Sequence, residues 1–185
     1  PIIGHLIRHG FAVQAYDIDQ TTRAAVEERG GRWATLEQLT RTAQAILICV
    51  GYDRELRDLM AKGLATQPGS GALLAVLSTV HPRTVQELDA RARSAGVLVV
   101  DATLCRGARA ADAGTLLSFV AGEPDAVERL KPVVAAYSAD IVYTGAIGTA
   151  QAAKAANNLL MWACLIANHE ALALAARFGV DVNLL

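Results

Sequence analysis

Hydrophobic residues along this chain fall into short, uniformly apolar runs that alternate with segments of helical spacing. The clearest runs are Ala45 to Val50 and Val97 to Val100. Uniformly apolar strands are typical of a parallel sheet that is covered on both faces. The intervening segments carry apolar residues three and four positions apart, which predicts amphipathic helices. This alternation over the first 145 residues predicts an α/β fold with a doubly wound, mostly parallel sheet.

The same pattern places the individual elements. Strands are predicted at residues 11–17, 45–50, 72–77, 97–101, 116–121 and 141–143. Helices are predicted at residues 1–10, 20–29, 36–42, 54–64, 82–95 and 124–137. A last helix of roughly thirty residues runs from about Gly148 to Phe178 and ends at Gly179. It predicts a connector into a helical domain, so we expect an α/β domain at residues 1–147 and the start of an all-α domain at residues 148–185.

Composition limits the classes of function. The chain has 185 residues, of which 53% are apolar and 19% charged, enough apolar surface for a folded core. The net charge of −1 gives no electrostatic case for binding nucleic acid or an anionic membrane. We find no signal peptide and no apolar run that reaches the length of a membrane span. Three widely spaced cysteines (Cys49, Cys105 and Cys164) argue against a disulfide framework or a zinc site. We therefore expect a cytoplasmic protein that binds no metal and no membrane.

The most informative stretch runs from Gly145 to Asn158 and contains Lys154. Helix geometry places Lys154, Asn157 and Asn158 on one face, because residues three and four apart are neighbours. The flanking residues are nearly all Ala, Leu and Met, which predicts a buried or half-buried helix. One interpretation is a surface lysine with two asparagines near a frayed end. The other is a proton-transfer lysine with amide partners that orient a small polar substrate, and the cost of burying unpaired polar groups favours it.

Polar residues and glycines follow several predicted strands, and ligands of doubly wound sheets bind beyond these carboxyl ends. Asp17 follows the first strand, where an acid can accept both hydroxyl donors of an adenosine ribose and repel a 2′-phosphate. It is alternatively a turn residue that caps the next helix, a role that also suits Asp19. Gly51 follows the second apolar strand and would let a ligand approach the backbone.

Two further strand ends also allow two interpretations. Ser78 and Thr79, shortly before Pro82, are either ligand contacts or the N-cap of the next helix. The stretch from Asp101 to Gly107 requires a sharp turn of the backbone. Arg106 within it is either a surface residue or a bidentate ligand for a substrate carboxylate.

Together these motifs resemble the β-hydroxyacid dehydrogenase family, the group of 3-hydroxyisobutyrate and tartronate semialdehyde dehydrogenases. The family's substrate loop, Asp-Ala-Pro-Val-Ser-Gly-Gly with a later Ala and Gly-Thr-Leu, is similar to Asp101–Gly107, Ala111 and Gly114–Leu116. Its signature Gly-x-Gly-x-x-x-Lys-x-x-Asn-Asn matches Gly148 and Lys154–Asn158, although Ala146 to Gly148 is looser than the pattern. Two further motifs also match, namely Ser78-Thr79 with Pro82, and Glu170–Ala175 with Gly179–Asp181. Together with the substrate loop and the lysine signature, they make four motifs in the family's order.

The resemblance implies a Rossmann-like fold and an NAD(P)-dependent oxidoreductase. Such an enzyme transfers a hydride between nicotinamide and a small β-hydroxy acid or its semialdehyde. The implied general acid/base is Lys154, and the implied substrate-binding residues are Cys105, Arg106, Gly107, Asn157 and Asn158. The implied cofactor-binding residues are Asp17, Ile18, Val50, Gly51 and Thr79. The pair Asp17-Ile18 has no arginine for a 2′-phosphate, so NAD is expected in preference to NADP. A homodimer or homotetramer is also implied.

The chain departs from the family in two respects. Thr103, Cys105 and Arg106 stand where the family has Pro, Ser and Gly, which leaves the identity of the hydroxy acid open. The family opens with a strand and a Gly-x-Gly-x-x-Gly loop that holds the pyrophosphate. The resemblance therefore predicts a fragment that begins just after the third glycine and lacks most of the helical domain. Such a portion should bind dinucleotide poorly by itself.

The sequence also allows other functional interpretations. An imine reductase usually has another proton donor in place of the lysine, and a 6-phosphogluconate-type dehydrogenase carries a histidine in the Lys-x-x-x-Asn run. A non-catalytic dinucleotide-binding scaffold belongs to a different class, whose lineages tend to lose the lysine. A cysteine-dependent enzyme using Cys105 lacks a base, because no histidine lies near Cys105 in the sequence.

Overall fold

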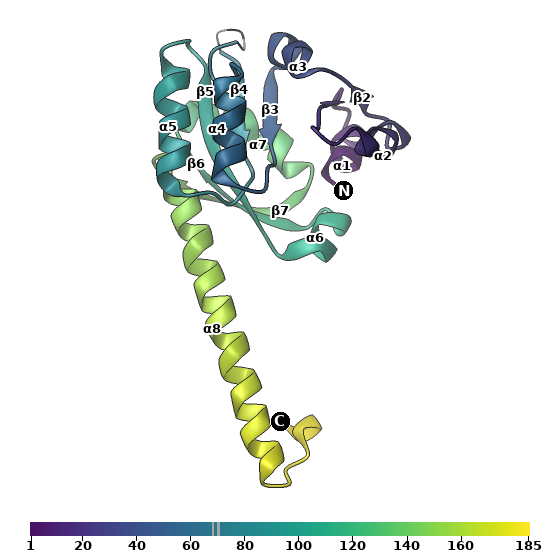
Figure 1. Ribbon diagram of the computed structural model, residues 1–185, viewed down its shortest axis with the longest axis vertical. Helices are drawn as coiled ribbons and strands as arrows, with labels where there is room; N and C mark the ends of the chain where they lie inside the picture. The colour runs from purple at the N-terminus through teal and green to yellow at the C-terminus, as the bar shows by residue number, and fades with distance from the viewer. Residues whose placement is uncertain (68, 70) are drawn as a thin grey trace.

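The computed structural model describes residues 1–67, 69 and 71–185. Its body is built around a five-stranded sheet with the order β3-β4-β5-β6-β7 (Figure 1). The strands are β3 (Ala45–Ile48), β4 (Leu73–Val76), β5 (Leu98–Cys105), β6 (Leu116–Ala121) and β7 (Ser138–Gly145). Strands β3, β4 and β5 are parallel, β6 is antiparallel to β5, and β7 is parallel to β6. The prediction of a mostly parallel sheet is confirmed.

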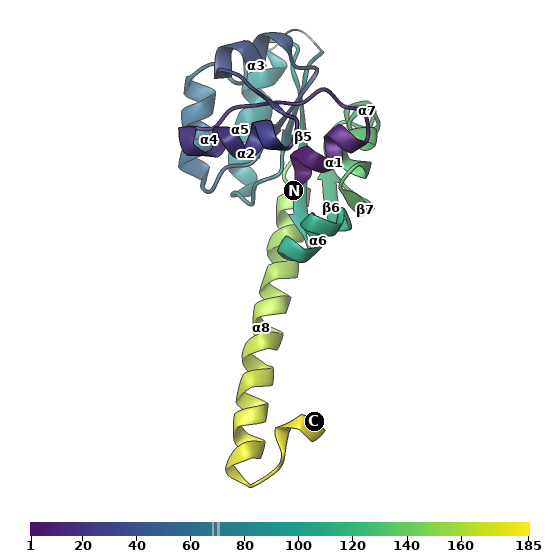
Figure 2. The same cartoon turned by 90° about the vertical axis from the view of Figure 1, so that its right-hand side faces the viewer.

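Helices cover both faces of this sheet, as Figure 2 shows. On one face lie α4 (Asp53–Ala61) and α5 (Pro82–Arg93), and on the other lie α1 (Ile2–Arg8) and α7 (Pro124–Ala135). Successive residues of β4 alternate between the two cores, because side chains of a strand point to opposite faces. Leu73 and Ala75 pack with the α1 and α7 side chains, and Leu74 and Val76 with those of α4 and α5. The doubly wound architecture follows from these two apolar layers.

Strands β1 (Gln14–Ala15) and β2 (Arg32–Trp33) form a separate two-stranded parallel sheet. They flank η1 (Gln20–Thr22) and α2 (Arg23–Glu28), and α3 (Leu36–Thr42) follows them. The strand predicted at residues 11–17 is therefore much shorter than expected. The sequence analysis missed β2, because Arg32 and Trp33 follow two glycines and form no apolar run.

Strand β5 extends four residues beyond the predicted end at Asp101. The predicted strand end at Asp101 was wrong, because the strand continues to Cys105. The sharp turn expected between Asp101 and Gly107 lies at Arg106, whose φ is 83°. The short helix α6 (Gly107–Ala113) then follows, where no helix was predicted. The polar residues that suggested a strand end are instead buried against a helix from the far end of the chain.

That helix is α8 (Thr149–Arg177), which begins against the sheet and then projects away from the body (Figure 1). Only Ala150 and Gln151 are buried, so the prediction of a buried or half-buried helix is wrong for most of its length. Its exposed large apolar residues are Leu159, Leu160, Met161, Trp162, Leu165, Ile166, Leu172 and Leu174. The short turn η2 (Val182–Leu184) follows α8. Helix α8 begins close to the predicted domain boundary at 147/148, and the division into two domains stays a prediction.

By length and composition, α8 is apolar enough to cross a membrane. Its most apolar 18-residue window has a mean hydropathy of 1.5, and none of that window is buried. The expectation that no apolar segment reaches the length of a span is therefore wrong. Polar residues such as Asn168 and His169 interrupt the segment, so a search for one continuous apolar run misses it. A single helix of this kind is weak evidence for a membrane, since helices of soluble proteins can have the same length and composition.

Candidate functional site

The candidate site lies where the end of β5 meets the start of α8. Asp101 and Thr103 of β5 point toward α8, because alternate residues of a strand share one face. The backbone N–H of Gln151 donates to Asp101 Oδ2 at 3.0 Å, and Gln151 Nε2 donates to Asp101 Oδ1 at 2.8 Å. The Thr103 hydroxyl donates to the carbonyl oxygen of Ala150 at 3.2 Å. These buried contacts fix the first turn of α8 on the sheet.

Gln151 also joins α8 to the loop after β4. Its Nε2 donates to the carbonyl oxygen of Ser78 at 2.9 Å, and its Oε1 accepts from the backbone N–H of Val80 at 3.0 Å. Its side chain is almost fully buried, so each of these polar groups depends on a protein partner. One side chain thus holds together the carboxyl ends of β4 and β5 and the start of α8.

Asp101 is a buried carboxyl group at the N-terminus of α8. Burial raises the pKa of Asp101 to about 6. Hydrogen bonds from Gln151 and from the backbone N–H groups of Gly148 and Ala150 act in the opposite direction, because they stabilise the carboxylate. The helix N-terminus favours negative charge in the same way. Desolvation nevertheless dominates, so the pKa of Asp101 lies above its usual value.

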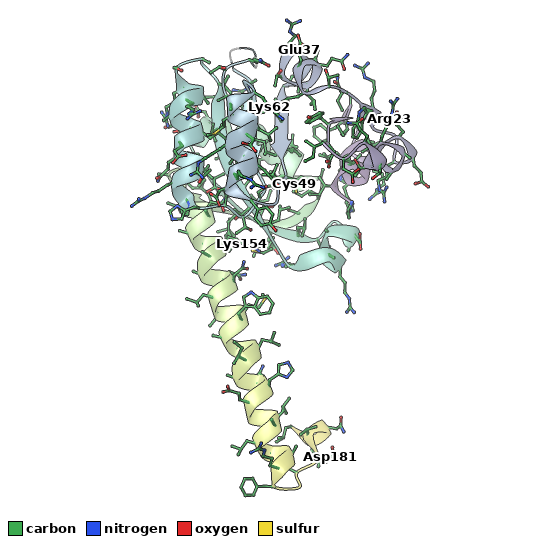
Figure 3. All side chains as sticks on the ribbon, in the orientation of Figure 1. Arg23, Glu37, Cys49, Lys62, Lys154 and Asp181 are labelled. Atoms are coloured by element: carbon green, nitrogen blue, oxygen red, sulfur yellow. The ribbon has the colours of Figure 1, made fainter. Side chains whose placement is uncertain are left out.

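Lys154 lies one helical turn after Gln151 and faces the end of β5. Its Nζ donates to Cys105 Sγ at 3.6 Å, and the lysine is half-buried. Figure 3 places Lys154 where α8 leaves the body. A cavity of about 230 Å³ lies beside this contact, and its lining residues are Leu104, Cys105, Gly107, Ala108, Ala111, Leu116 and Lys154. The amine is therefore held at the mouth of a small, mainly apolar cavity.

Asn157 and Asn158 follow Lys154 on the same helix. Asn158 is half-buried and Asn157 is exposed. Among the residues that the structure describes, neither carboxamide has a hydrogen-bond partner. Both amides are thus available for a ligand near Lys154, and their spacing of three and four residues keeps them on its side of the helix.

Arg106 and Gly107 form the turn between β5 and α6. The Arg106 guanidinium forms an ion pair with Asp140 at 2.6 Å and donates to the carbonyl oxygen of Thr115 at 3.2 Å. Gly107 lines the cavity beside Lys154, whereas Arg106 is not among the cavity-lining residues. The structure therefore brings Cys105 and Gly107 to the lysine and engages Arg106 with Asp140 on β7.

The residues expected to hold a cofactor follow the carboxyl ends of neighbouring strands. Ile48 at the end of β3 pairs with Val76 at the end of β4, so Val50, Gly51 and Thr79 follow at the same edge. The N–H of Val50 donates to the Ser78 hydroxyl at 2.6 Å, and that of Gly51 donates to a Glu55 carboxylate oxygen at 2.7 Å. Thr79 and Gly51 are exposed, which leaves this edge open to a ligand.

Asp17 and Ile18 follow β1 in the two-stranded sheet. Asp17 Oδ1 accepts from the N–H of Asp19 at 2.9 Å, and Ile18 is 74% exposed. Asp19 caps η1, because its carboxylate accepts from the N–H of Thr21 at 2.9 Å. Capping is thus the role of Asp19, and the expected contact of the exposed Asp17 carboxylate with a ribose stays a prediction.

Within the described residues, no group of three or more His, Cys, Asp and Glu side chains has an arrangement that could hold a metal ion.

Residues 1–145 match the family described as the NAD binding domain of 6-phosphogluconate dehydrogenase. The chain belongs to this family. The family match supports a nicotinamide dinucleotide, NAD or NADP, as cofactor and confirms the Rossmann-like fold. The roles of Val50 and Gly51 in holding it stay a prediction. The strand-end features that the sequence analysis singled out, from Asp17 to Gly107, all fall inside the matched segment.

Curated relatives extend the similarity over the whole chain. A mitochondrial 3-hydroxyisobutyrate dehydrogenase of Mus musculus is 28% identical over 188 aligned positions, which cover 100% of this chain and 56% of the relative. An NAD-dependent L-serine dehydrogenase of Pseudomonas aeruginosa is 27% identical and covers 100% of this chain and 63% of the relative. The chain thus spans little more than half the length of the curated relatives that it matches. The resemblance to 3-hydroxyisobutyrate dehydrogenases is confirmed.

A solved structure supports the same arrangement of elements. A Mycobacterium tuberculosis 3-hydroxyisobutyrate dehydrogenase with L-serine superimposes with a TM-score of 0.93 at 27% identity, covering 98% of this chain and 62% of that one. This coverage includes most of α8, so the projecting helix has a counterpart in a solved dehydrogenase. An imine reductase from Pseudomonas sp. has a TM-score of 0.87 at 19% identity and shares the fold.

The sequence analysis missed Gln151 as the residue that joins α8 to the sheet. Asp101, Thr103 and Cys105 alternate with Ala102 and Leu104, and this period of two is the signal of a strand with one polar face. The residue that contacts this polar face, Gln151, could not be predicted from the local pattern, because it lies some fifty residues later along the chain.

Proposed function

We propose that the protein containing this chain is an NAD(P)-dependent oxidoreductase that acts on a small β-hydroxy acid or its semialdehyde. Membership of the NAD-binding family supports the cofactor class. Similarity to 3-hydroxyisobutyrate and L-serine dehydrogenases supports the substrate class, since both names describe small hydroxy acids. The homo-oligomeric state stays a prediction. The cytoplasmic location also stays a prediction, and the mouse relative is mitochondrial.

The observation that carries this proposal is the position of Lys154. Its amine lies 3.6 Å from Cys105 at a cavity of about 230 Å³, beyond the carboxyl end of β5. When bound, the nicotinamide accepts or donates the hydride, which is chemistry that a protein does not supply by itself. The task left for the protein is to hold the hydroxyl group and move its proton. Lys154 takes that proton during oxidation and returns it during reduction.

The remaining residues bind and orient. Asn158, together with Asn157, donates to or accepts from the substrate hydroxyl or carboxylate without adding charge beside the lysine. Cys105 and Gly107 form the wall of the cavity. Arg106, engaged by Asp140, shapes the turn that presents Gly107. Asp17 and Ile18 hold the adenosine ribose, Val50 and Gly51 the middle of the dinucleotide, and Thr79 lies near the nicotinamide.

The experiment that tests the proposal uses the purified protein with a panel of short β-hydroxy acids and semialdehydes. Turnover is followed by the absorbance of the reduced nicotinamide. We expect Lys154→Ala to lower kcat by about a hundredfold or more, as expected when general acid–base catalysis is lost. Lys62→Ala is the matched control, because Lys62 is exposed at the end of α4 and far from the site (Figure 3). Near-normal kcat in Lys154→Ala would refute the role of the lysine.

The second candidate is a non-catalytic dinucleotide-binding scaffold, which the open edge at Gly51 and Thr79 also allows. Tight binding of NAD without turnover of any acid in the panel would favour the scaffold. Turnover that depends on Lys154 would exclude it.

A further inference from the structure

The contact between Cys105 and Lys154 joins two different nucleophiles. Lys154 Nζ donates to Cys105 Sγ at 3.6 Å, and the two side chains come from α8 and β5. Cys105 is 4% exposed, whereas Cys49 and Cys164 are exposed. This chain therefore places a thiol, and not a hydroxyl, against the lysine amine. A thiol can be oxidised reversibly, and a hydroxyl in the same place cannot.

We propose that Cys105 and Lys154 form a site of oxidative modification, at which a peroxide generates a covalent bond between Sγ and Nζ. In the first step the thiol attacks the peroxide oxygen, the O–O bond breaks, and the products are a Cys105 sulfenic acid and water or an alcohol. In the second step the neutral Lys154 amine attacks the sulfur. The S–O bond breaks, water leaves with one amine proton, and a sulfenamide remains. The peroxide is the oxidant, and the sulfur is oxidised.

The geometry favours attack of the Lys154 amine on the Cys105 sulfenic acid over reaction of the sulfenic acid with other groups. The two atoms come from β5 and α8, and the hydrogen bonds between Asp101 and Gln151 hold these elements together. Reacting groups held this close need little further ordering, which is the basis of high effective molarity. The lysine side chain has four rotatable bonds, so Nζ can move toward sulfur while the backbone stays in place.

The cavity provides access for the oxidant. It borders both Cys105 and Lys154, and its other lining residues are mainly apolar. Its volume of about 230 Å³ admits a small neutral peroxide. The amine of Lys154 is the nucleophile that already contacts the sulfur, at 3.6 Å.

The test uses the purified protein carrying Cys49→Ser and Cys164→Ser, in which Cys105 is the only thiol. The protein is treated with hydrogen peroxide, digested with trypsin and analysed by mass spectrometry. We expect the peptide that ends at Arg106 to be linked to a peptide that spans Lys154. The linked pair should be lighter than the separate peptides by a pair of hydrogen atoms, and a dithiol should release it. This readout is covalent mass, so it stands whether or not Lys154 transfers a proton in catalysis.

The control adds Lys154→Arg in the same background. With no primary amine beside the sulfur, we expect the link to disappear and dimedone to trap the Cys105 sulfenic acid instead. Oxidation of Cys105 with Lys154 left unlinked would overturn the proposal, and so would a Cys105 thiol that stays reduced in the folded protein.

A second probe tests the pair without oxidation. o-Phthalaldehyde forms a fluorescent isoindole only where a thiol and a primary amine are adjacent, with loss of water. We expect fluorescence in the protein with Cys105 as its only thiol and none after Lys154→Arg. An absence of fluorescence in both proteins would show that the thiol and the amine are not adjacent and accessible in solution, which would also overturn the proposal.

Discussion

Gln151 donates two hydrogen bonds to Asp101, one from its backbone N–H at 3.0 Å and one from Nε2 at 2.8 Å. This pair connects the centre of the sheet to the helix that carries Lys154. Because Lys154 follows Gln151 by one turn, the position of the amine over the end of β5 depends on this contact. The structure thus makes Asp101 and Gln151 positioning residues for the proposed catalytic lysine.

Replacing Gln151 by leucine should weaken the fold markedly. The change keeps most of the volume but leaves Asp101, the carbonyl of Ser78 and the N–H of Val80 without this partner. Buried groups that lose a partner cost about 1–3 kcal/mol each, so we expect the free energy of unfolding to fall by about 3 kcal/mol or more. Urea unfolding measures the change.

The matched control for that experiment is Gln86→Leu. The Gln86 amide donates to the carbonyl of Ile147 at 3.3 Å, and the side chain is exposed. We expect its effect to stay within about 0.5 kcal/mol, as is usual for surface changes. Equal losses in the two variants would contradict the role assigned to Gln151.

The stability of the protein should depend on pH through Asp101. Burial raises its pKa from 3.8 to about 6, so the folded state holds the proton more tightly than the unfolded chain does. The resulting stabilisation is fully present below pH 3.8 and is lost as the pH rises through about 6. A shift of about two pKa units corresponds to about 3 kcal/mol.

Asp101→Asn isolates this contribution, because the amide does not titrate. We expect the difference in free energy of unfolding between the original protein and the variant to fall by about 3 kcal/mol between acid and neutral pH. Parallel urea titrations at several pH values measure it. A difference that is independent of pH would show that the Asp101 carboxyl has the same pKa in the folded and unfolded states.

Much of the fold, and part of the candidate site, could be predicted from the sequence. Residues 36–42 and 116–121 were predicted with the bounds that α3 and β6 have, because local apolar patterns decide both. The extent of β5 could not be predicted in this way, since Asp101 and Thr103 are stable in a strand only because α8 supplies their partners. The cluster at Lys154 was predicted from helix geometry, whereas its contact with Cys105 depends on how the helix is docked.

The left-handed backbone at Arg106 should store strain that glycine would release. Its φ is 83°, a conformation that costs a residue with a side chain about 1 kcal/mol relative to glycine. Arg106→Ala removes the exposed ion pair with Asp140, which contributes about 0–1 kcal/mol, and keeps the strain. We therefore expect Arg106→Gly to be more stable than Arg106→Ala by about 1 kcal/mol in thermal or urea unfolding. The opposite order would mean that the turn is not strained.

The choice between NAD and NADP should depend on Asp17. Its exposed carboxylate is expected to accept the ribose hydroxyls of NAD and to repel the 2′-phosphate of NADP. The substitution Asp17→Asn removes the negative charge, so the 2′-phosphate of NADP is no longer repelled and the ribose hydroxyls of NAD lose a charged acceptor. A hydrogen bond to a charged group contributes about 1.5 kcal/mol. We expect the ratio of kcat/KM for NAD to that for NADP to fall by about tenfold, since 1.4 kcal/mol corresponds to a factor of ten. Asp19→Asn is the control, because Asp19 caps η1 through Thr21 and its change should leave the ratio as it is. If both variants shifted the ratio equally, the preference would come from the fold of this loop and not from the Asp17 charge.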